Sequence, residues 1–296
     1  MSFASQGSVT TDVLEIGYEA TGEPGGVPVI LLHGFPYDVR AYDEVADELA
    51  ASGRYVLAPY LRGYGPTRFR ETGALRSGQQ GAIGQDLLDF MDGLGIERAV
   101  VAGYDWGGRA ACIAAALWPE RINGLVTCGG YAIQDIARSG EPAAAEDEQK
   151  YWYQYYFQSE RGRRGLTSNR DELCALLWRD WSPKWVGADA AYPATSPSLH
   201  NPDFVDVVIH SYRHRYGLVE GDPRYEAVED KLAALPKIDV PTVILVSEAD
   251  GVTGPAGLED GPHFSGPCEI RSLPDIGHNV PQEAPVAFAQ AVTALG

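Results

Sequence analysis

The chain of 296 residues carries 41 acidic and 23 basic side chains, giving a formal net charge of −18 at pH 7, and 45% of its residues are hydrophobic. This acidic balance argues against binding to nucleic acid or to an anionic membrane surface. No apolar stretch is long enough to span a membrane, and the first residues lack the basic start and apolar core of a secretory signal. The four cysteines are widely spaced, which predicts reduced core residues of a cytoplasmic protein rather than a zinc site.

The first half of the chain alternates between predicted strands and helices. Residues 10–20 alternate loosely, as an antiparallel strand does. Short apolar runs without polar alternation, typical of strands buried on both faces, follow at "VPVILLHG", "YVLAPYL", "RAVVAGYD" and "GLVTCGG". Between two of them, Ile83, Leu87 and Met91 recur at helical spacing. This order predicts an α/β fold with a mostly parallel central sheet flanked by helices.

The pattern changes after about Tyr131. Residues 135–220 are rich in Trp, Tyr and Arg, several segments there have helical character, and no strong strand is present. Buried-strand patterns return at "PTVILVSEAD" and "CEIRSLPD". We therefore expect a core in two parts, residues 1–133 and 237–296, with a helical cap at 134–236 inserted after the sixth strand.

Asp105 stands at a sharp turn between a predicted strand and a predicted helix. Gly103 and Gly107 flank it in a G-x-D-x-G pattern, and the familiar version of this pattern has a nucleophilic serine at the centre. Such a turn strains the central residue and exposes it at the carboxyl edge of the sheet. The alternative is that Asp105 only caps the helix.

The layout resembles the α/β-hydrolase family over nearly the whole chain except the lid. "HGFP" (33–36) follows a strand, where that family places its oxyanion-hole loop, and "LPDIGHNVPQEAP" is similar to its catalytic-histidine loop. The resemblance implies a nucleophile at Asp105, an acid at Asp250 and a base at His278, in that family's chain order. Glu248 and Asp135 are rival acids. His33 is interpreted as structural because the backbone of its neighbours matters more than its ring.

An aspartate nucleophile suits displacement at a saturated carbon, which gives an alkyl ester on the enzyme. His278 would then activate the water that cleaves this ester, and Asp250 would orient the imidazole. The backbone N–H groups of Phe35 and Trp106 would form the oxyanion hole of that second step. This chemistry needs no cofactor and no metal.

Two substrate types fit this displacement, namely epoxides and carbons that bear a halide. In the epoxide hydrolases of the family two lid tyrosines stabilise the developing alkoxide, and the resemblance of "YQYYFQ" (153–158) and "SYR" (211–213) implies Tyr153 and Tyr212 for these roles. Ring packing between lid and core is the alternative for both tyrosines. Nearby rivals for the two positions are Tyr151, Tyr155, Tyr156 and Tyr216.

Dehalogenases that use the same aspartate are the second enzymatic hypothesis. Trp106 is similar to a halide-binding tryptophan of the haloalkane dehalogenases, although these usually place Asn or Glu where Phe35 stands. Fluoroacetate dehalogenases bind a carboxylate with arginines one and four residues after the nucleophile, so Trp106 departs from their pattern and Arg109 matches it. Phe35, Trp106 and Arg109 are thus the candidate substrate-binding residues. For a lone arginine, a helix-surface or ion-pair role is the more common one.

The sequence therefore predicts an epoxide hydrolase that makes a vicinal diol from a small-molecule substrate. A dehalogenase is the alternative, and a binding protein that kept the fold without the chemistry is the third hypothesis. A homodimer is left open by the sequence.

Overall fold

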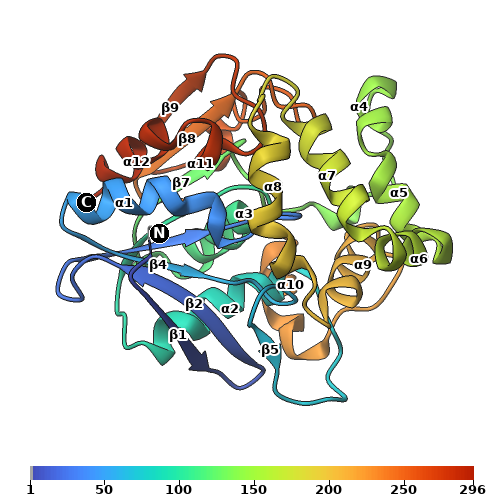
Figure 1. Cartoon of the computed structure of the whole chain (residues 1–296), viewed down its shortest axis with the longest axis horizontal. Coiled ribbons are helices and arrows are strands. Elements are labelled where there is room, and N and C mark those ends of the chain that lie inside the picture. The colour runs from blue at the N-terminus through green and yellow to red at the C-terminus, as the bar shows by residue number, and fades with distance from the viewer. Residues whose placement is uncertain (1–2) are drawn as a thin grey trace.

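The computed structural model describes residues 3–296, so residues 1 and 2 of the expected first core segment lie outside the described part (Figure 1). The strands are β1 (Ser5–Thr10), β2 (Leu14–Thr21), β3 (Val27–Leu32), β4 (Arg54–Pro59), β5 (Arg68–Phe69), β6 (Ala99–Gly103), β7 (Ile122–Cys128), β8 (Thr242–Ser247) and β9 (Cys268–Leu273). The α-helices are α1 (Asp43–Ala51), α2 (Gln80–Gly93), α3 (Asp105–Leu117), α4 (Ala145–Lys150), α5 (Trp152–Gln158), α6 (Glu160–Ser168), α7 (Arg170–Trp181), α8 (Ala188–Leu199), α9 (Phe204–His214), α10 (Glu226–Leu232), α11 (Val280–Glu283) and α12 (Pro285–Thr293). Short 3-10 turns are η1 (Val39–Tyr42), η2 (Pro119–Arg121), η3 (Ile136–Arg138), η4 (Pro223–Tyr225) and η5 (Gly261–His263).

The strands form one sheet in the order β1-β2-β4-β3-β6-β7-β8-β9, with β5 paired to β2. All pairs from β4 to β9 along this order are parallel, and β2 pairs antiparallel with β1, β4 and β5. Every residue of β6 and β8 is buried. These strands lack polar alternation because both faces of the sheet are covered, with α1 packed on α12 and α2 packed on α3. The expected α/β fold with a mostly parallel, helix-flanked sheet is confirmed.

The amino-terminal part differs from the sequence-based prediction. In place of one strand at 10–20, the structure has the hairpin of β1 and β2, and the Thr11 side chain accepts hydrogen bonds from the N–H groups of Val13 and Leu14 in the turn. The first strand, "SQGSVT", is mostly exposed and polar, so it carries no alternation that a sequence reader could detect.

Between β7 and β8 the described chain contains helices and turns only, from η3 through α10, and they lie beside the sheet in Figure 1. This segment follows the seventh strand rather than the sixth. The sequence shows neither β1 nor the two-residue β5, which is too short to be seen there and forms by pairing Glu15 with Arg68 and Leu14 with Phe69.

Not all four cysteines lie in the core. Cys112 and Cys174 are buried and Cys128 is half-buried, but Cys268 is exposed, and all four are free thiols. The expectation fails for Cys268 because it begins β9, an edge strand with mostly exposed residues. None of the helices that the structure describes is long and apolar enough to cross a membrane.

Candidate active site

Asp105 is the first residue of α3 and directly follows β6 and Tyr104. Its φ of 51° lies in the left-handed region, a strain of about 1–3 kcal/mol for a residue that is not glycine. The tight turn needs close backbone contacts, since a Cβ on Gly107 would lie 1.9 Å from the carbonyl oxygen of Leu32. The side chain of Asp105 makes no capping bond. Its Oδ1 instead accepts a hydrogen bond of 2.7 Å from the Phe35 N–H, so the capping alternative is wrong.

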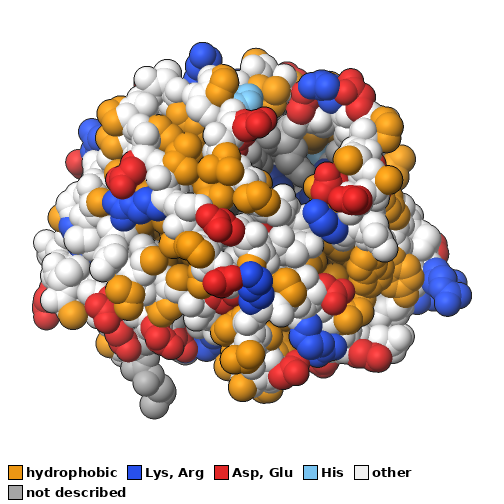
Figure 2. Space-filling model, turned by 90° about the horizontal axis from the view of Figure 1, so that it is seen from above, with side chains coloured by type: hydrophobic (Ala, Val, Ile, Leu, Met, Phe, Trp, Pro, Cys, Tyr) orange, Lys and Arg blue, Asp and Glu red, His pale blue; other side chains and the backbone are white. Residues whose placement is uncertain are grey.

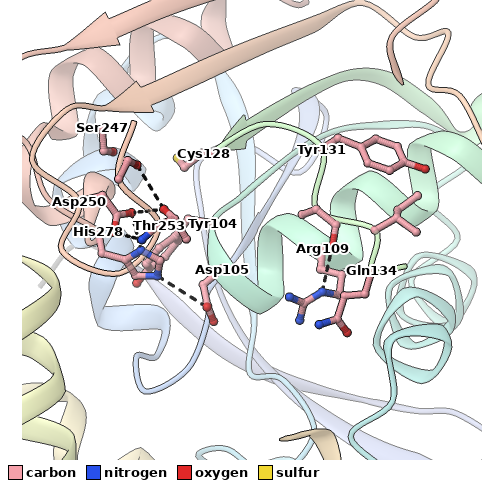
Figure 3. Close-up of a pocket in the computed structure, with 14 residues that line it drawn as sticks. Tyr104, Asp105, Arg109, Cys128, Tyr131, Gln134, Ser247, Asp250, Thr253 and His278 are labelled. Carbon is pink, nitrogen blue, oxygen red and sulfur yellow. Dashed lines mark hydrogen bonds and ion pairs between the residues drawn. The ribbon is translucent and has the colours of Figure 1, made fainter. Parts of the chain in front are cut away.

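Three side chains meet at the carboxyl ends of β6 and β8. His278 Nδ1 lies 2.7 Å from Asp250 Oδ2, and His278 Nε2 lies 3.6 Å from Asp105 Oδ2 (Figure 3). Asp250 is held by the N–H groups of Val252 and Thr253, which donate to its Oδ1 at 2.8 and 3.0 Å. The imidazole thus has one nitrogen toward a fixed carboxylate and the other toward the candidate nucleophile.

The charges of these three groups depend on one another. Burial lowers the pKa of His278, but the negative charges of Asp250 and Asp105 have the larger effect and raise this pKa to about 10. Burial raises the pKa of both carboxyls, yet their contacts with His278 bring each pKa below its ordinary value. These contacts favour the protonated imidazole and the two ionised carboxylates over the neutral forms.

The rival residues are occupied elsewhere. Glu248 is exposed and accepts a hydrogen bond from Ser272, and Asp135 caps the turn η3 by accepting from the Arg138 N–H. His33 is fully buried, and its Nε2 accepts a hydrogen bond from the Leu61 N–H. Burial lowers the pKa of His33 to about 4, so its ring is neutral and braces the loop that carries Phe35.

Tyr153 on α5 and Tyr212 on α9 lie together despite 58 intervening residues in the sequence. Their ring centroids are 5.4 Å apart, and the Phe35 ring lies 6.4 Å from the first and 5.5 Å from the second. They are 4% and 1% exposed, and the Asp105 carboxylate contributes to the raised pKa of each after burial. The rivals are less buried. Tyr155 is exposed, Tyr151 and Tyr156 are half-buried, and Tyr216 is half-buried and donates to Gln154.

Trp106 follows Asp105 and packs its ring against Phe35, with centroids 5.8 Å apart. Its indole N–H is buried and has no hydrogen-bond partner within residues 3–296. A donor left in this way beside the candidate nucleophile is available to a ligand.

Arg109 is half-buried and forms no ion pair with any described carboxylate. Its Nε donates to the Ala132 carbonyl at 3.1 Å, and its side chain lines a cavity together with Asp105 (Figure 3). Arg109 reaches this cavity because residues four apart on a helix lie on the same face, and Arg109 stands four residues after Asp105.

Sequence reasoning missed three residues at this site. Arg215 lies over the Tyr212 ring at 4.2 Å, and its Nε and one terminal nitrogen are buried without a partner in the described chain. Tyr37 has a buried hydroxyl without a partner and a ring 6.2 Å from that of His278. The Trp181 carbonyl accepts hydrogen bonds from the N–H groups of Gly251 and His278, at 3.0 and 3.1 Å. Only Arg215 had a sequence signal, since it stands one helical turn after Tyr212.

A cavity of about 300 Å³ opens beside the three charged groups. Asp105 and His278 lie at one side of it and Arg109 and Gln134 at the other (Figure 3). The remaining lining residues are Tyr104, Cys128, Gly129, Tyr131, Ala132, Ile133, Ser247, Asp250, Thr253 and Gly254. Within residues 3–296, no group of three or more His, Cys, Asp or Glu side chains could hold a metal ion.

Comparison with known proteins gives consistent relatives. A family model described as alpha/beta hydrolase fold matches residues 27–285. Epoxide hydrolase A of Mycobacterium tuberculosis is 26% identical, over 94% of this chain and 92% of that protein. An epoxide hydrolase of Caballeronia sordidicola is 27% identical, over 91% and 87%. The crystal structure of a proposed epoxide hydrolase from Klebsiella pneumoniae is 43% identical and superposes with a TM-score of 0.97, over 99% of this chain and 98% of that one.

Proposed function

This chain belongs to the α/β-hydrolase family, and from that premise we propose that it hydrolyses an epoxide to a vicinal diol through an alkyl ester on Asp105. The observation that carries the proposal is the carboxylate at the nucleophile position with two buried phenols close to it. A carboxylate displaces a leaving group from a saturated carbon, and a phenol gives a proton to an alkoxide. The names of the relatives agree with this chemistry.

In the first step a carboxylate oxygen of Asp105 forms a bond to an epoxide carbon, and the ring C–O bond breaks. Its electron pair passes to the ring oxygen, which takes a proton from Tyr153 or Tyr212. Burial of both phenols keeps water from competing for the developing charge. Burial raises the pKa of both tyrosines, and the positive charge of Arg215 partly offsets this effect. Arg215 therefore makes both phenols better proton donors.

In the second step His278 Nε2 takes a proton from water, and the water oxygen attacks the ester carbon of Asp105. The oxyanion is stabilised by the N–H groups of Phe35 and Trp106. The bond between Cγ and the alkyl oxygen then breaks and the diol leaves. Of the two protons of the water, one passes to the leaving oxygen and the other restores the tyrosine, so Asp105 is again a carboxylate. Esterification removes the negative charge of Asp105, one of the causes that raise the pKa of His278. The base is therefore more readily neutral in the step that needs it.

We further propose that residues 134–236 form a cap that closes over this centre. The support is the position of Tyr153, Tyr212 and the Trp181 carbonyl, which all lie in that range and contact core residues of the site. A protein that kept the fold without catalysis has no need of a nucleophile, base and acid at these distances.

A dehalogenase remains the second candidate because the buried Trp106 indole N–H has no partner. Weak donors of this kind suit a halide, whereas a phenol suits an alkoxide. A panel of epoxides and haloacids, assayed for diol and for free halide, separates the two functions. Diol without halide supports the proposal, and halide release with epoxides untouched contradicts it.

The covalent step has its own test in His278→Gln, which retains the nucleophile but removes the base. After addition of an intact epoxide that the native protein hydrolyses, mass spectrometry should find the mass of protein plus substrate on the peptide that contains Asp105. The control is Asp105→Ala, which should be inactive and unmodified. An unmodified His278→Gln protein at saturating substrate would contradict the two-step route.

A further inference from the structure

The hydroxyl of Tyr153 accepts a hydrogen bond from the residue next to it in the chain. Gln154 follows Tyr153 on α5, and the two residues are 7% and 4% exposed. Gln154 Nε2 donates to the Tyr153 hydroxyl oxygen at 3.1 Å. The proton of this hydroxyl has no acceptor within residues 3–296, so it is available to a ligand.

The orientation of the Gln154 amide is set from its other side. Gln154 Oε1 accepts from the Tyr216 hydroxyl at 3.0 Å and from Arg215 Nη1 at 3.5 Å. A guanidinium donates hydrogen bonds and cannot accept them, so the atom that faces Arg215 must be the amide oxygen. The N–H₂ group is thereby directed to Tyr153. Arg215 and Tyr216 directly follow α9, so the end of that helix orients a side chain of α5.

The backbone of this segment is also fixed to α9. Gln158 Nε2 donates to the carbonyl of Gln154 at 2.9 Å and to the carbonyl of Tyr212 at 2.8 Å. The Gln154 N–H donates to the Tyr151 carbonyl at 2.8 Å. These bonds hold α5 and α9 together, so the amide of Gln154 keeps its position relative to both phenols.

This contact makes the two tyrosines unequal. Burial raises the pKa of both phenols, and Arg215 opposes that effect at both. Hydrogen bonds from Gln154 and from Tyr212 further oppose it at Tyr153. A bond donated to a phenol oxygen becomes about twice as strong when the oxygen is charged, so it stabilises the phenolate more than the phenol. Loss of the proton therefore costs less free energy at Tyr153 than at Tyr212.

We propose that Gln154 is a positioning residue whose amide selects Tyr153, rather than Tyr212, to give its proton to the ring oxygen; this rests on the proposed epoxide hydrolysis. When the ring C–O bond breaks, its electron pair passes to the ring oxygen, which takes the Tyr153 proton. The phenolate accepts from Gln154 Nε2 until a proton of the hydrolytic water restores the phenol. Tyr212 donates a hydrogen bond to the same oxygen and keeps its proton.

The test replaces the donor by an acceptor of the same shape. In Gln154→Glu one carboxylate oxygen faces Arg215 and Tyr216, and the other accepts the Tyr153 proton and withdraws it from the substrate. Ester formation from styrene oxide, followed by stopped-flow tryptophan fluorescence, should slow about 100-fold at about pH 8. Gln154→Met only removes the donor and should slow it about 10-fold. Gln149→Glu, at an exposed position on α4, adds the same charge and is the matched control.

The pH profile separates this role from a structural one. In the native protein the lowered pKa of Asp105 keeps the nucleophile ionised, so ester formation should stay nearly constant between about pH 8 and about pH 5. In Gln154→Glu the introduced carboxyl takes up a proton over this range and can donate again, so ester formation should rise about 10-fold. Arginine and tyrosine side chains do not titrate here. Those near Tyr153 are Arg109, Arg215, Tyr212 and Tyr216.

An unchanged rate in Gln154→Glu, or a loss that does not recover at low pH, would overturn the role of Gln154, while turnover of styrene oxide by the native protein upholds epoxide hydrolysis. If Gln154→Glu does not fold, Gln154→Met decides. Slower ester formation with unchanged ester hydrolysis supports the inference, and an unchanged rate or an equal loss in both steps overturns it.

If no epoxide is opened, calorimetric binding of phenylacetamide decides the question, because its carbonyl oxygen accepts the same proton. Gln154→Glu should bind it at least about 10-fold more weakly than the native protein at about pH 8 and regain affinity at about pH 5. Equal affinities of the two proteins, or no binding by the native protein, overturn the inference.

Discussion

At the scale of single residues, the site combines one strained carboxylate with neighbours that set its charge. Asp105 is held at a positive φ, accepts from the Phe35 N–H and lies 3.6 Å from the imidazole of His278. Each contact favours the ionised carboxylate against the opposing effect of burial. A nucleophile that remains charged in a buried place has lost much of its hydration, which increases its reactivity towards carbon.

The tyrosines provide the first prediction at this scale. Tyr153→Phe and Tyr212→Phe should each slow ester formation about 100-fold, close to 2.7 kcal/mol, because each removes a donor to the developing alkoxide. Ester hydrolysis should change much less, since its oxyanion contacts the backbone at Phe35. Stopped-flow tryptophan fluorescence separates the two steps. Tyr155→Phe is the matched control, being exposed on the same helix, and unchanged ester formation in both single variants would exclude the donor role.

The pH dependence is the second prediction. His278 has a pKa raised to about 10 in the free protein, where burial is outweighed by Asp250 and Asp105. Loss of the Asp105 charge in the ester lowers that pKa, and water activation needs the neutral ring. Ester hydrolysis should therefore become faster as pH rises from about 6 to about 9, while ester formation stays nearly constant because the lowered pKa of Asp105 keeps it ionised. Single-turnover rates measure both, and hydrolysis that slows with rising pH would contradict this assignment.

At the scale of elements, the end of α7 connects the loops that carry Asp250 and His278. The Trp181 carbonyl binds both loops through Gly251 and His278. The next residue, Ser182, donates to Glu283 Oε1 at 2.6 Å, and Glu283 Oε2 accepts from the Gly277 N–H at 2.8 Å. A segment expected from the sequence to belong to the cap thus also holds the histidine loop in position.

The third prediction concerns this brace. Ser182→Ala should lower the free energy of unfolding by about 1 kcal/mol, because it removes the buried hydroxyl that donates to Glu283. The looser loop should slow ester hydrolysis about 10-fold, which is less than the roughly 100-fold loss in rate that a 1 Å misplacement can cause. The rate of ester formation should stay within about two-fold of the native rate. Urea denaturation and single-turnover kinetics give the two values. Ser196→Ala, at an exposed hydroxyl on α8, is the control, and an equal effect on both steps would argue for general damage.

The sequence was sufficient where the position of a candidate residue follows from strand order. Asp105 and Asp250 each follow a buried strand, and His278 stands in the loop after the edge strand β9, so parallel pairing brings them to one edge of the sheet. It was insufficient where contacts depend on helix packing. The unpaired cation of Arg215 and the half-buried place of Arg109 at the cavity result from how the helices around α3 and α9 meet, and periodicity does not specify this arrangement.

At the scale of the whole molecule, buried polar contacts join segments that are far apart in the sequence. Asp38, beside the Phe35 loop, accepts from Thr195 at 2.7 Å and from Ser198 at 2.5 Å, both on α8. Figure 2 shows a hollow in the surface, with acidic and basic side chains mixed around its opening. These bonds join α8 to the loop that carries Phe35.

A second connection of this kind is the buried pair of Arg62 and Asp86. The Arg62 guanidinium has no exposed surface, donates to both oxygens of Asp86 at 2.7 Å and also donates to the hydroxyl of Tyr225 at 2.9 Å. Asp86 lies on α2 and Tyr225 lies on η4, just before α10, so one side chain ties three parts of the chain together.

The fourth prediction is that Arg62→Ala lowers the free energy of unfolding by about 3–5 kcal/mol, because it leaves the Asp86 carboxylate buried without a cation. The double variant Arg62→Met, Asp86→Leu should recover most of this loss, since an apolar pair of similar volume requires no buried charge. Recovery stays incomplete, because the carbonyl of Ser77 and the Tyr225 hydroxyl each lose a partner. Urea denaturation of the two proteins beside the native one gives the comparison. A double variant as unstable as Arg62→Ala would mean that the bonds to Ser77 and Tyr225, rather than the ion pair, hold these three segments together.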